Sequence, residues 1–174
     1  VWGDYGLGVY NSQSLKELKR LGFAGCTASF ELKLAQIRDL SKGLDTELVV
    51  YGRLPLMITE NCLVQNETGC RLNRQGPCVP EDGPCRCGQP NVLVDRTGAA
   101  FPLLPAYGHR TEIQNSKPLY LADRPEHRRL GLAYARLRFT TETAEECVSV
   151  VQNYLDAAPA AGDFTRGLYE RGVE

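Results

Sequence analysis

Five cysteines lie close together near the middle of this 174-residue chain, and their thiols are its most chemically distinctive side chains. Clustered thiolates on one segment bind iron–sulfur clusters or structural zinc. The spacings of 8, 8, 7 and 2 residues contain no C-x-x-C pair, which counts against a simple zinc ribbon. The sequence therefore predicts a metal site and leaves the metal open. The five are Cys62, Cys70, Cys78, Cys85 and Cys87.

The metal could instead have a purely structural role. A loop with little apolar content cannot pack by itself, and a bound metal ion would hold it together by coordination. The total of seven cysteines is odd, and α/β units are not typical of a secreted disulfide framework. No apolar run approaches the roughly 20 residues of a membrane-spanning helix. We therefore expect a cytoplasmic protein with reduced thiols and no membrane segment.

A second set of polar residues follows the expected strands, where barrel enzymes place their catalytic groups. Arg53 and Arg138 would clamp a carboxylate or phosphate, or form a buried pair with Glu31 or Glu60. Glu31 would act as a general base or cap a helix. No nucleophile elbow and no H-E-x-x-H motif is present. The full set is Asn11, Ser29, Glu31, Arg53, Arg138 and Thr140.

Alternating strands and helices would position these residues. Strands are expected at 7–10, 23–28, 47–52 and 132–140. Helices are expected from a capping box at Ser14 and Glu17 to Gly22, at 32–40, and after a second box at Thr143 and Glu146. Such β-α-β units demand parallel strands. The last helix has an apolar stripe that predicts its buried face: Ala144, Cys147, Val148, Val151 and Leu155.

The cysteine loop and a small antiparallel insert interrupt this rhythm. Short strands are expected at 91–95, 100–104 and 117–121, with a turn at 96–98. The predicted segments are thus 1–60, 61–123 and 124–174. Four βα units are half of an eight-unit barrel, and an open sheet leaves two edges exposed. We therefore expect either an upstream half of the same protein, since Val1 lies within an apparent strand, or a homodimer through these edges.

Several motifs resemble those of the collagenase-like peptidase family, called "U thirty-two" in peptidase classification. The run ELVVYGRLPLMITENC at 47–62 is similar to the family's core signature. DRTG at 95–98 with Phe101-Pro102, then Asn115-Ser116 with Pro118-Leu119, resemble the segments that follow it, and TRGLYERGVE resembles its end. The resemblance implies a fold: an α/β chain forming the second half of a TIM-like (β/α) barrel.

The resemblance also implies a cofactor, because some members carry a 4Fe–4S cluster on four cysteines. It favours that cluster over zinc. The implied ligands are Cys62, Cys85 and Cys87, with Cys70 or Cys78 as the fourth and His109 in reserve. The chain departs from the family at Pro55, where several members have cysteine, and at His109, where cysteine is frequent.

Three functions follow from these observations. The first is iron–sulfur-dependent hydroxylation of tRNA or rRNA, as in some family members. Net charge is −1, so any RNA would bind locally, and the arginines of 124–138 form either a basic patch or a solvated face. The second is a peptidase, as other members are called, using metal-activated water. The third is a non-enzymatic, metal-clipped binding domain.

Overall fold

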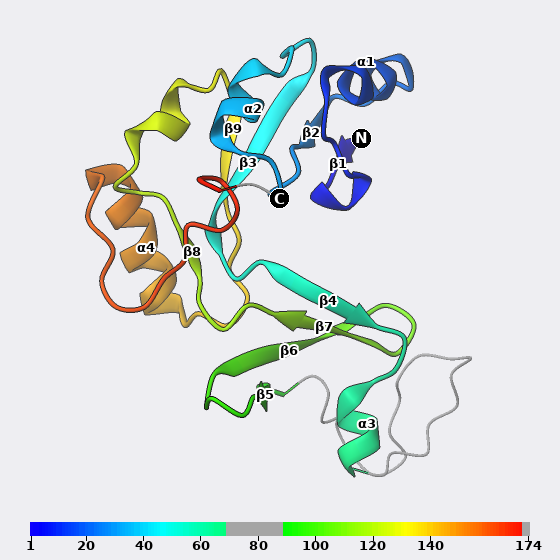
Figure 1. Ribbon diagram of the computed structural model, residues 1–174, viewed down its shortest axis with the longest axis vertical. Helices are drawn as coiled ribbons and strands as arrows, with labels where there is room; N and C mark the ends of the chain where they lie inside the picture. The colour runs from blue at the N-terminus through cyan, green and yellow to red at the C-terminus, as the bar shows by residue number, and fades with distance from the viewer. Residues whose placement is uncertain (69–88, 172–174) are drawn as a thin grey trace. The chain divides into compact units, whose positions relative to one another are not determined.

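The computed structural model describes residues 1–68 and 89–171, and these fold into two compact units (Figure 1). Unit 1 combines Val1–Gly52 with Pro118–Glu174, and unit 2 is the inserted segment Arg53–Lys117. Four predicted ligands lie outside the described residues: Cys70, Cys78, Cys85 and Cys87. Within the described residues, no helix combines the length and apolar character needed to cross a bilayer.

Unit 1 is built on an open mixed sheet with four parallel strands in chain order. At Glu47, β3 pairs with both β2 and β9, so these two strands lie on opposite edges of β3. The fifth strand runs antiparallel to the end of β3, on the edge that β2 has left. No closed barrel forms within the described parts of the chain. The strands are β1 (Trp2–Gly3), β2 (Gly25–Thr27), β3 (Asp45–Gly52), β9 (Tyr134–Leu137) and the antiparallel β8 (Leu119–Tyr120).

The helices of unit 1 are α1 (Ser12–Arg20), α2 (Leu34–Asp39) and α4 (Ala144–Asp156). The capping box of α4 is confirmed, because the Thr143 and Glu146 side chains each accept the other's backbone N–H. The box predicted for α1 was wrong. Asn11 is the N-cap and accepts the Ser14 N–H at 2.9 Å, so α1 begins earlier than expected. An asparagine side chain serves this position as well as serine.

The predicted buried face of α4 was also wrong. Val148 and Leu155 are each 71% exposed, and Val151 is 42% exposed. Val150 and Tyr154 pack instead against the cluster around Tyr51. The reason is that Tyr154 can bury its ring and still donate its hydroxyl, here to the Val50 carbonyl at 2.5 Å.

The core of unit 1 lies on both faces of β3, where Leu48, Val49 and Val50 are fully buried. Tyr169, from the C-terminal segment, is 1% exposed and donates its hydroxyl to the Val49 carbonyl at 2.7 Å. Arg166 binds Asp123 through two parallel hydrogen bonds of 2.6 and 2.7 Å. These contacts fasten the C-terminal segment to the sheet.

The strand predicted at 7–10 was wrong, because Tyr5–Leu7 forms a 3-10 helix (η1) capped by Asp4. A second 3-10 helix (η3) spans Pro125–Arg129. The segment 117–121 was placed wrongly in the insert, since its strand β8 belongs to the sheet of unit 1.

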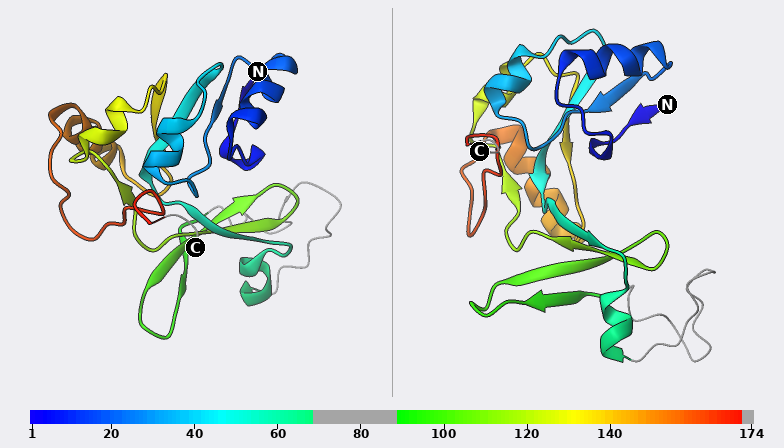
Figure 2. Two further views of the ribbon diagram at one scale, coloured as in Figure 1. Left: turned by 45° about the horizontal axis from the view of Figure 1, so that its top comes forward. Right: turned by 45° about the vertical axis from the view of Figure 1, so that its right-hand side comes forward.

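The described residues of unit 2 form an antiparallel sheet and a short helix (Figure 2). Its hairpin turn at 96–98 is confirmed by the Gly98 N–H bond to the Asp95 carbonyl and by φ of +85° at Gly98. The sheet order is β4 (Pro55–Thr59), β7 (Arg110–Gln114), β6 (Ala100–Ala106) and β5 (Asn91–Val94), and the helix is α3 (Leu63–Thr68).

Candidate functional site

One face of the unit 1 sheet is concave. The evidence is that side chains of its two outer parallel strands contact each other across this face. The rings of Trp2 and Tyr134 are 5.4 Å apart at 74°. Asp4, which follows β1, binds Arg136 of β9 at 2.6 Å. Two strands separate β1 from β9 in the sheet, so these contacts require strong curvature. We call this surface, with its side chains, the concave face.

A glycine makes the first of these contacts possible. A Cβ atom on Gly25 would lie 2.2 Å from the Trp2 ring, so the ring can cross β2 only over a residue without a side chain. Farther along the strands, the Glu47 carboxylate accepts hydrogen bonds from Thr27 at 2.7 Å and Arg136 at 2.6 Å. Residues two apart on one strand share a face, so the polar layer follows the aromatic layer.

The polar layer is internally paired and therefore organises the concave face rather than offering free groups. The side chains of Glu47 and Arg136 are 14% and 28% exposed. Partly buried charges in contact with opposite charges hold each other's geometry, and removing either leaves a costly unpaired charge.

Beyond this layer, the carboxyl ends of the parallel strands bring together several predicted site residues. Ser29 and Glu31 follow β2, Arg138 follows β9, and Tyr5 follows β1. The Arg138 guanidinium carbon lies 5.9 Å from the centre of the Tyr5 ring. Carboxyl ends of parallel strands are where α/β enzymes bind substrates.

Glu31 forms a short hydrogen bond with the Tyr10 hydroxyl, which donates to its carboxylate. This bond is the main cause that raises the pKa of Tyr10 above its usual value. The backbone N–H of Glu31 donates to Ser29 Oγ at 3.2 Å. Glu31 had been expected either as a general base or as a helix cap, and the N-cap of α2 is Lys33 instead. The Glu31 carboxylate is held at the strand ends by Tyr10. Tyr10 had not been predicted as a site residue.

The other predicted residues have diverse partners. Arg53, in unit 2, donates through Nη1 to the carbonyls of Asn115 and Ser116. Glu60 binds Arg110 at 3.0 Å. The Thr140 hydroxyl oxygen is buried and has no hydrogen-bond partner among the residues that the structure describes. Arg53 and Arg138 belong to different units, and their joint clamp stays a prediction.

Sequence reasoning also missed the role of Gly52 at the end of β3. Its φ is +119°, and a Cβ atom there would lie 2.0 Å from the Arg138 carbonyl oxygen. The Arg138 N–H donates to the Tyr51 carbonyl at 2.9 Å. Gly52 therefore allows the backbone that carries Arg138 to approach β3 closely. A glycine ending a buried strand was the available signal.

Cys62 is the one predicted thiol ligand within the described residues. It is 9% exposed, and its Sγ accepts the Gln65 N–H at 3.4 Å. Hydrogen bonds to the ligand sulfurs are one of the factors that set the reduction potential of iron–sulfur clusters, so this bond is compatible with a ligand role. The next residue, Leu63, donates its N–H to Thr111 Oγ1 at 3.0 Å. His109 lies two residues before Thr111, so the segments of Cys62 and His109 are neighbours.

The described residues contain no group of three or more histidine, cysteine, aspartate or glutamate side chains that could hold a metal ion. The surroundings of Cys62 nevertheless fit a thiolate ligand, because the sulfur is shielded and accepts an N–H. Cys26 is a different kind of residue. It is fully buried in β2, and burial raises the pKa of its thiol, which makes it a core residue.

Comparison with known proteins identifies the family. A family model described as Peptidase family U32 matches residues 6–96. The chain belongs to the U32 peptidase family. The U32 family consists mostly of enzymes. The matched U32 region includes Tyr10, Glu31 and Cys62 and ends before His109 and Arg138. No curated protein and no solved structure matched the chain.

Proposed function

We propose that this U32 chain belongs to an enzyme that hydroxylates tRNA or rRNA. A 4Fe–4S cluster would be held by Cys62, Cys85 and Cys87, with Cys70 or Cys78 as the fourth ligand and His109 in reserve. The observation that carries the proposal is the concentration of thiols around Cys62, whose shielded sulfur accepts the Gln65 N–H. When bound, the cluster would supply one-electron chemistry.

The proposal includes a fold, in which unit 1 is half of a TIM-like barrel. Its four parallel strands follow one another in the sheet in chain order, as in such barrels. The alternate residues of β9 also contribute to successive layers on the concave face, where Tyr134 meets Trp2 and Arg136 meets Asp4. Layers of side chains from alternate strand positions fill TIM barrels.

The residues at the strand ends would handle the substrate. Arg138 would bind a phosphate of the RNA, since a guanidinium matches its oxygens with two hydrogen bonds. Glu31 would accept a proton from the substrate, and Tyr10 would hold its carboxylate in place. RNA binding through Arg138 should weaken as salt increases, because each phosphate contact releases counterions.

Nucleoside mass spectrometry of tRNA and rRNA from a deletion strain tests the proposal. A hydroxylated nucleoside should be missing and should return when the wild-type gene is restored. The Glu31→Gln variant should fail to restore it. Glu17→Gln is the matched control, because Glu17 lies on the exposed surface of α1 and its carboxylate binds Arg20, three residues along the same helix. An unchanged nucleoside profile in the deletion strain would contradict the proposal.

The family description favours peptide hydrolysis as the second candidate. His127, one of the two histidines, is buried, with Nδ1 2.5 Å from the Arg124 carbonyl and its ring near Tyr154. Burial lowers its pKa, so it is a neutral packing residue at pH 7. Cleavage of gelatin or peptides that stops on chelation would favour this candidate over hydroxylation.

A further inference from the structure

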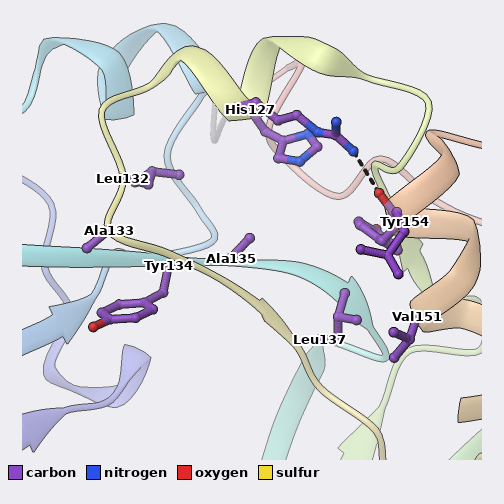
Figure 3. A pocket seen from close by; sticks show the side chains of 10 residues that line it. His127, Leu132, Ala133, Tyr134, Ala135, Leu137, Val151 and Tyr154 are labelled. Atoms are coloured by element: carbon purple, nitrogen blue, oxygen red, sulfur yellow. Dashed lines mark hydrogen bonds between the residues drawn. The ribbon is translucent and has the colours of Figure 1, made fainter. Parts of the chain in front are cut away.

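The side chains of β9 alternate between the two faces of the sheet, as in any extended strand. Leu137 lies next to Val151 of α4, and the Tyr134 ring points away from that helix (Figure 3). Tyr134 and Arg136 contact residues in and after β1, across the concave face. Arg138, two residues after Arg136, continues this series and also reaches a residue that follows β1.

Two consecutive residues after β1 receive the two arginines. Arg136 donates through Nη1 to the Asp4 carboxylate at 2.6 Å, and the Arg138 guanidinium carbon lies 5.9 Å from the centre of the Tyr5 ring. A guanidinium within about 6 Å of a ring centre is attracted by the negative face of the ring. The carboxyl ends of β9 and β1 are therefore joined by two adjacent contacts, one ionic and one aromatic.

The Asp4 carboxylate fixes the residue that carries the ring. Its Oδ1 atom accepts the Tyr5 N–H at 2.7 Å, which caps η1, and the same atom accepts the hydrogen bond from Arg136. Arg136 also binds Glu47 at 2.6 Å, and its side chain is 28% exposed. The backbone of Tyr5 is thus tied to β9 through one carboxylate oxygen, which limits the positions that the ring can take.

The Tyr5 ring also contacts the segment that carries the proposed base. Its centre lies 5.4 Å from the centre of the Phe30 ring, with the ring planes at 59°, which is a favourable geometry for an aromatic pair. Phe30 directly precedes Glu31 in the chain. One ring therefore contacts both Arg138 and the segment of Glu31, the two groups that the proposed reaction uses.

A ring contact suits an arginine that must bind an anion. The attraction to the ring face uses none of the N–H donors of a guanidinium, so it is compatible with two parallel hydrogen bonds to a phosphate. An arginine side chain also loses rotamer freedom when it binds a ligand, and ordering it beforehand reduces that cost. Phenylalanine in place of Tyr5 would keep the ring face, whereas leucine would remove it.

We propose that Tyr5 is a positioning residue, whose ring holds the Arg138 guanidinium at a set place beside the Glu31 segment. A phosphate bound to Arg138 would then determine which nucleotide of the RNA reaches Glu31. The assignment rests on the proposed function, because the phosphate contact and the proton transfer come from it. The contact between Tyr5 and Arg138 can be tested without RNA, so the two proposals can fail separately.

Nitrogen-correlated NMR of the arginine side chains tests the contact directly. The Arg138 Nε–H signal, identified by its absence from Arg138→Gln, should be shifted upfield by the Tyr5 ring. Tyr5→Leu should return it to the position of exposed arginines, and Tyr5→Phe should leave it shifted. Tyr107→Leu is the matched control and should leave it shifted too, because Tyr107 is 98% exposed in unit 2. An Arg138 signal that is the same in wild type and in folded Tyr5→Leu would overturn the proposal.

Fluorescence anisotropy with a labelled single-stranded RNA of about ten nucleotides measures the consequence for binding. Tyr5→Leu should weaken binding about fivefold, and Tyr5→Phe should not. In the Arg138→Gln background the same Tyr5→Leu change should have no effect, because Tyr5 acts through Arg138. Equal losses in both backgrounds would overturn the positioning role. Binding that Arg138→Gln leaves unchanged would instead contradict the phosphate contact of the proposed function, while the NMR spectra still decide whether Tyr5 holds Arg138.

Discussion

The two units of this protein differ in how completely their described residues bury their own apolar side chains. In unit 1, Val9, Leu15, Ile37 and Leu48 are 0–1% exposed. In unit 2, the best-buried large apolar side chains retain 6–9% exposure, and both outer strands expose apolar runs: Leu56, Met57 and Ile58 on β4, and Val92, Leu93 and Val94 on β5.

This difference shows that unit 1 is stabilised mainly by a conventional hydrophobic core, whereas unit 2 needs another source of stability. Backbone ladders and the bonds from Arg53 to the carbonyls of Asn115 and Ser116 supply part of it. Metal coordination by the cysteine-rich segment is the source we propose for the rest, because binding free energy then becomes folding free energy.

The largest effect is expected for Gly52→Ala, at the last residue of the first segment of unit 1. The new Cβ would combine a strained φ with a clash against the Arg138 carbonyl, so we expect a loss of about 4 kcal/mol or more in the free energy of unfolding. Urea denaturation measures it. Gly98→Ala is the control: φ is also positive, but nothing lies within 4 Å, so a loss of about 1 kcal/mol is expected. Equal losses in the two variants would show that the close approach of Gly52 to the Arg138 carbonyl does not add to the cost of the substitution.

Leu48→Ala should cost about 3 kcal/mol, because it leaves a cavity beside a fully buried strand. Met57→Ala in unit 2 should change the free energy of unfolding by less than about 0.5 kcal/mol, because the side chain is 58% exposed. Both are measured by urea denaturation. Similar costs at the two positions would mean that unit 2 is stabilised by a hydrophobic core of the same kind as unit 1.

Asp123→Asn should cost about 2 kcal/mol at pH 7, since it breaks a paired, charge-assisted contact with Arg166. Arg166 lowers the pKa of Asp123 in the folded state. Its contribution is therefore present above about pH 4, the unfolded value, and is lost as pH falls through the folded pKa. Denaturation curves of the two proteins should converge in acid. A constant difference down to the lowest pH would contradict this account.

The smallest effect is expected for Tyr169→Phe, which removes only the hydroxyl that donates to the Val49 carbonyl. The loss should be about 1 kcal/mol, read from thermal or urea unfolding. An unchanged stability would indicate that the packing of the ring alone fastens the C-terminal segment.

The sequence predicted the parts of the fold that depend on local patterns. The box at Thr143 and Glu146, the hairpin before Ala100 and the strand ending in Gly52 were all recognisable from residue type and spacing. The packed face of α4 was not, because Val148, Val151 and Leu155 are more apolar than Tyr154 but only tertiary contacts decide which stripe is covered.

The candidate site was predictable to a similar extent. The strand-end rule identified Glu31 and Arg138, which the structure places at the carboxyl ends of β2 and β9. Tyr10 could not be found in this way, since its role depends on a hydrogen bond to a residue 21 positions away. The curvature that joins Asp4 to Arg136 is also a property of the whole sheet and leaves no local pattern in the chain.

We propose that the cysteine-rich segment holds a redox-active metal cluster that completes unit 2. The most direct test is the iron and acid-labile sulfide content of the protein purified without oxygen. Our account predicts about four of each per chain, as in a 4Fe–4S cluster, and their loss in Cys62→Ser. Protein that contains neither iron nor sulfide under these conditions would contradict the claim.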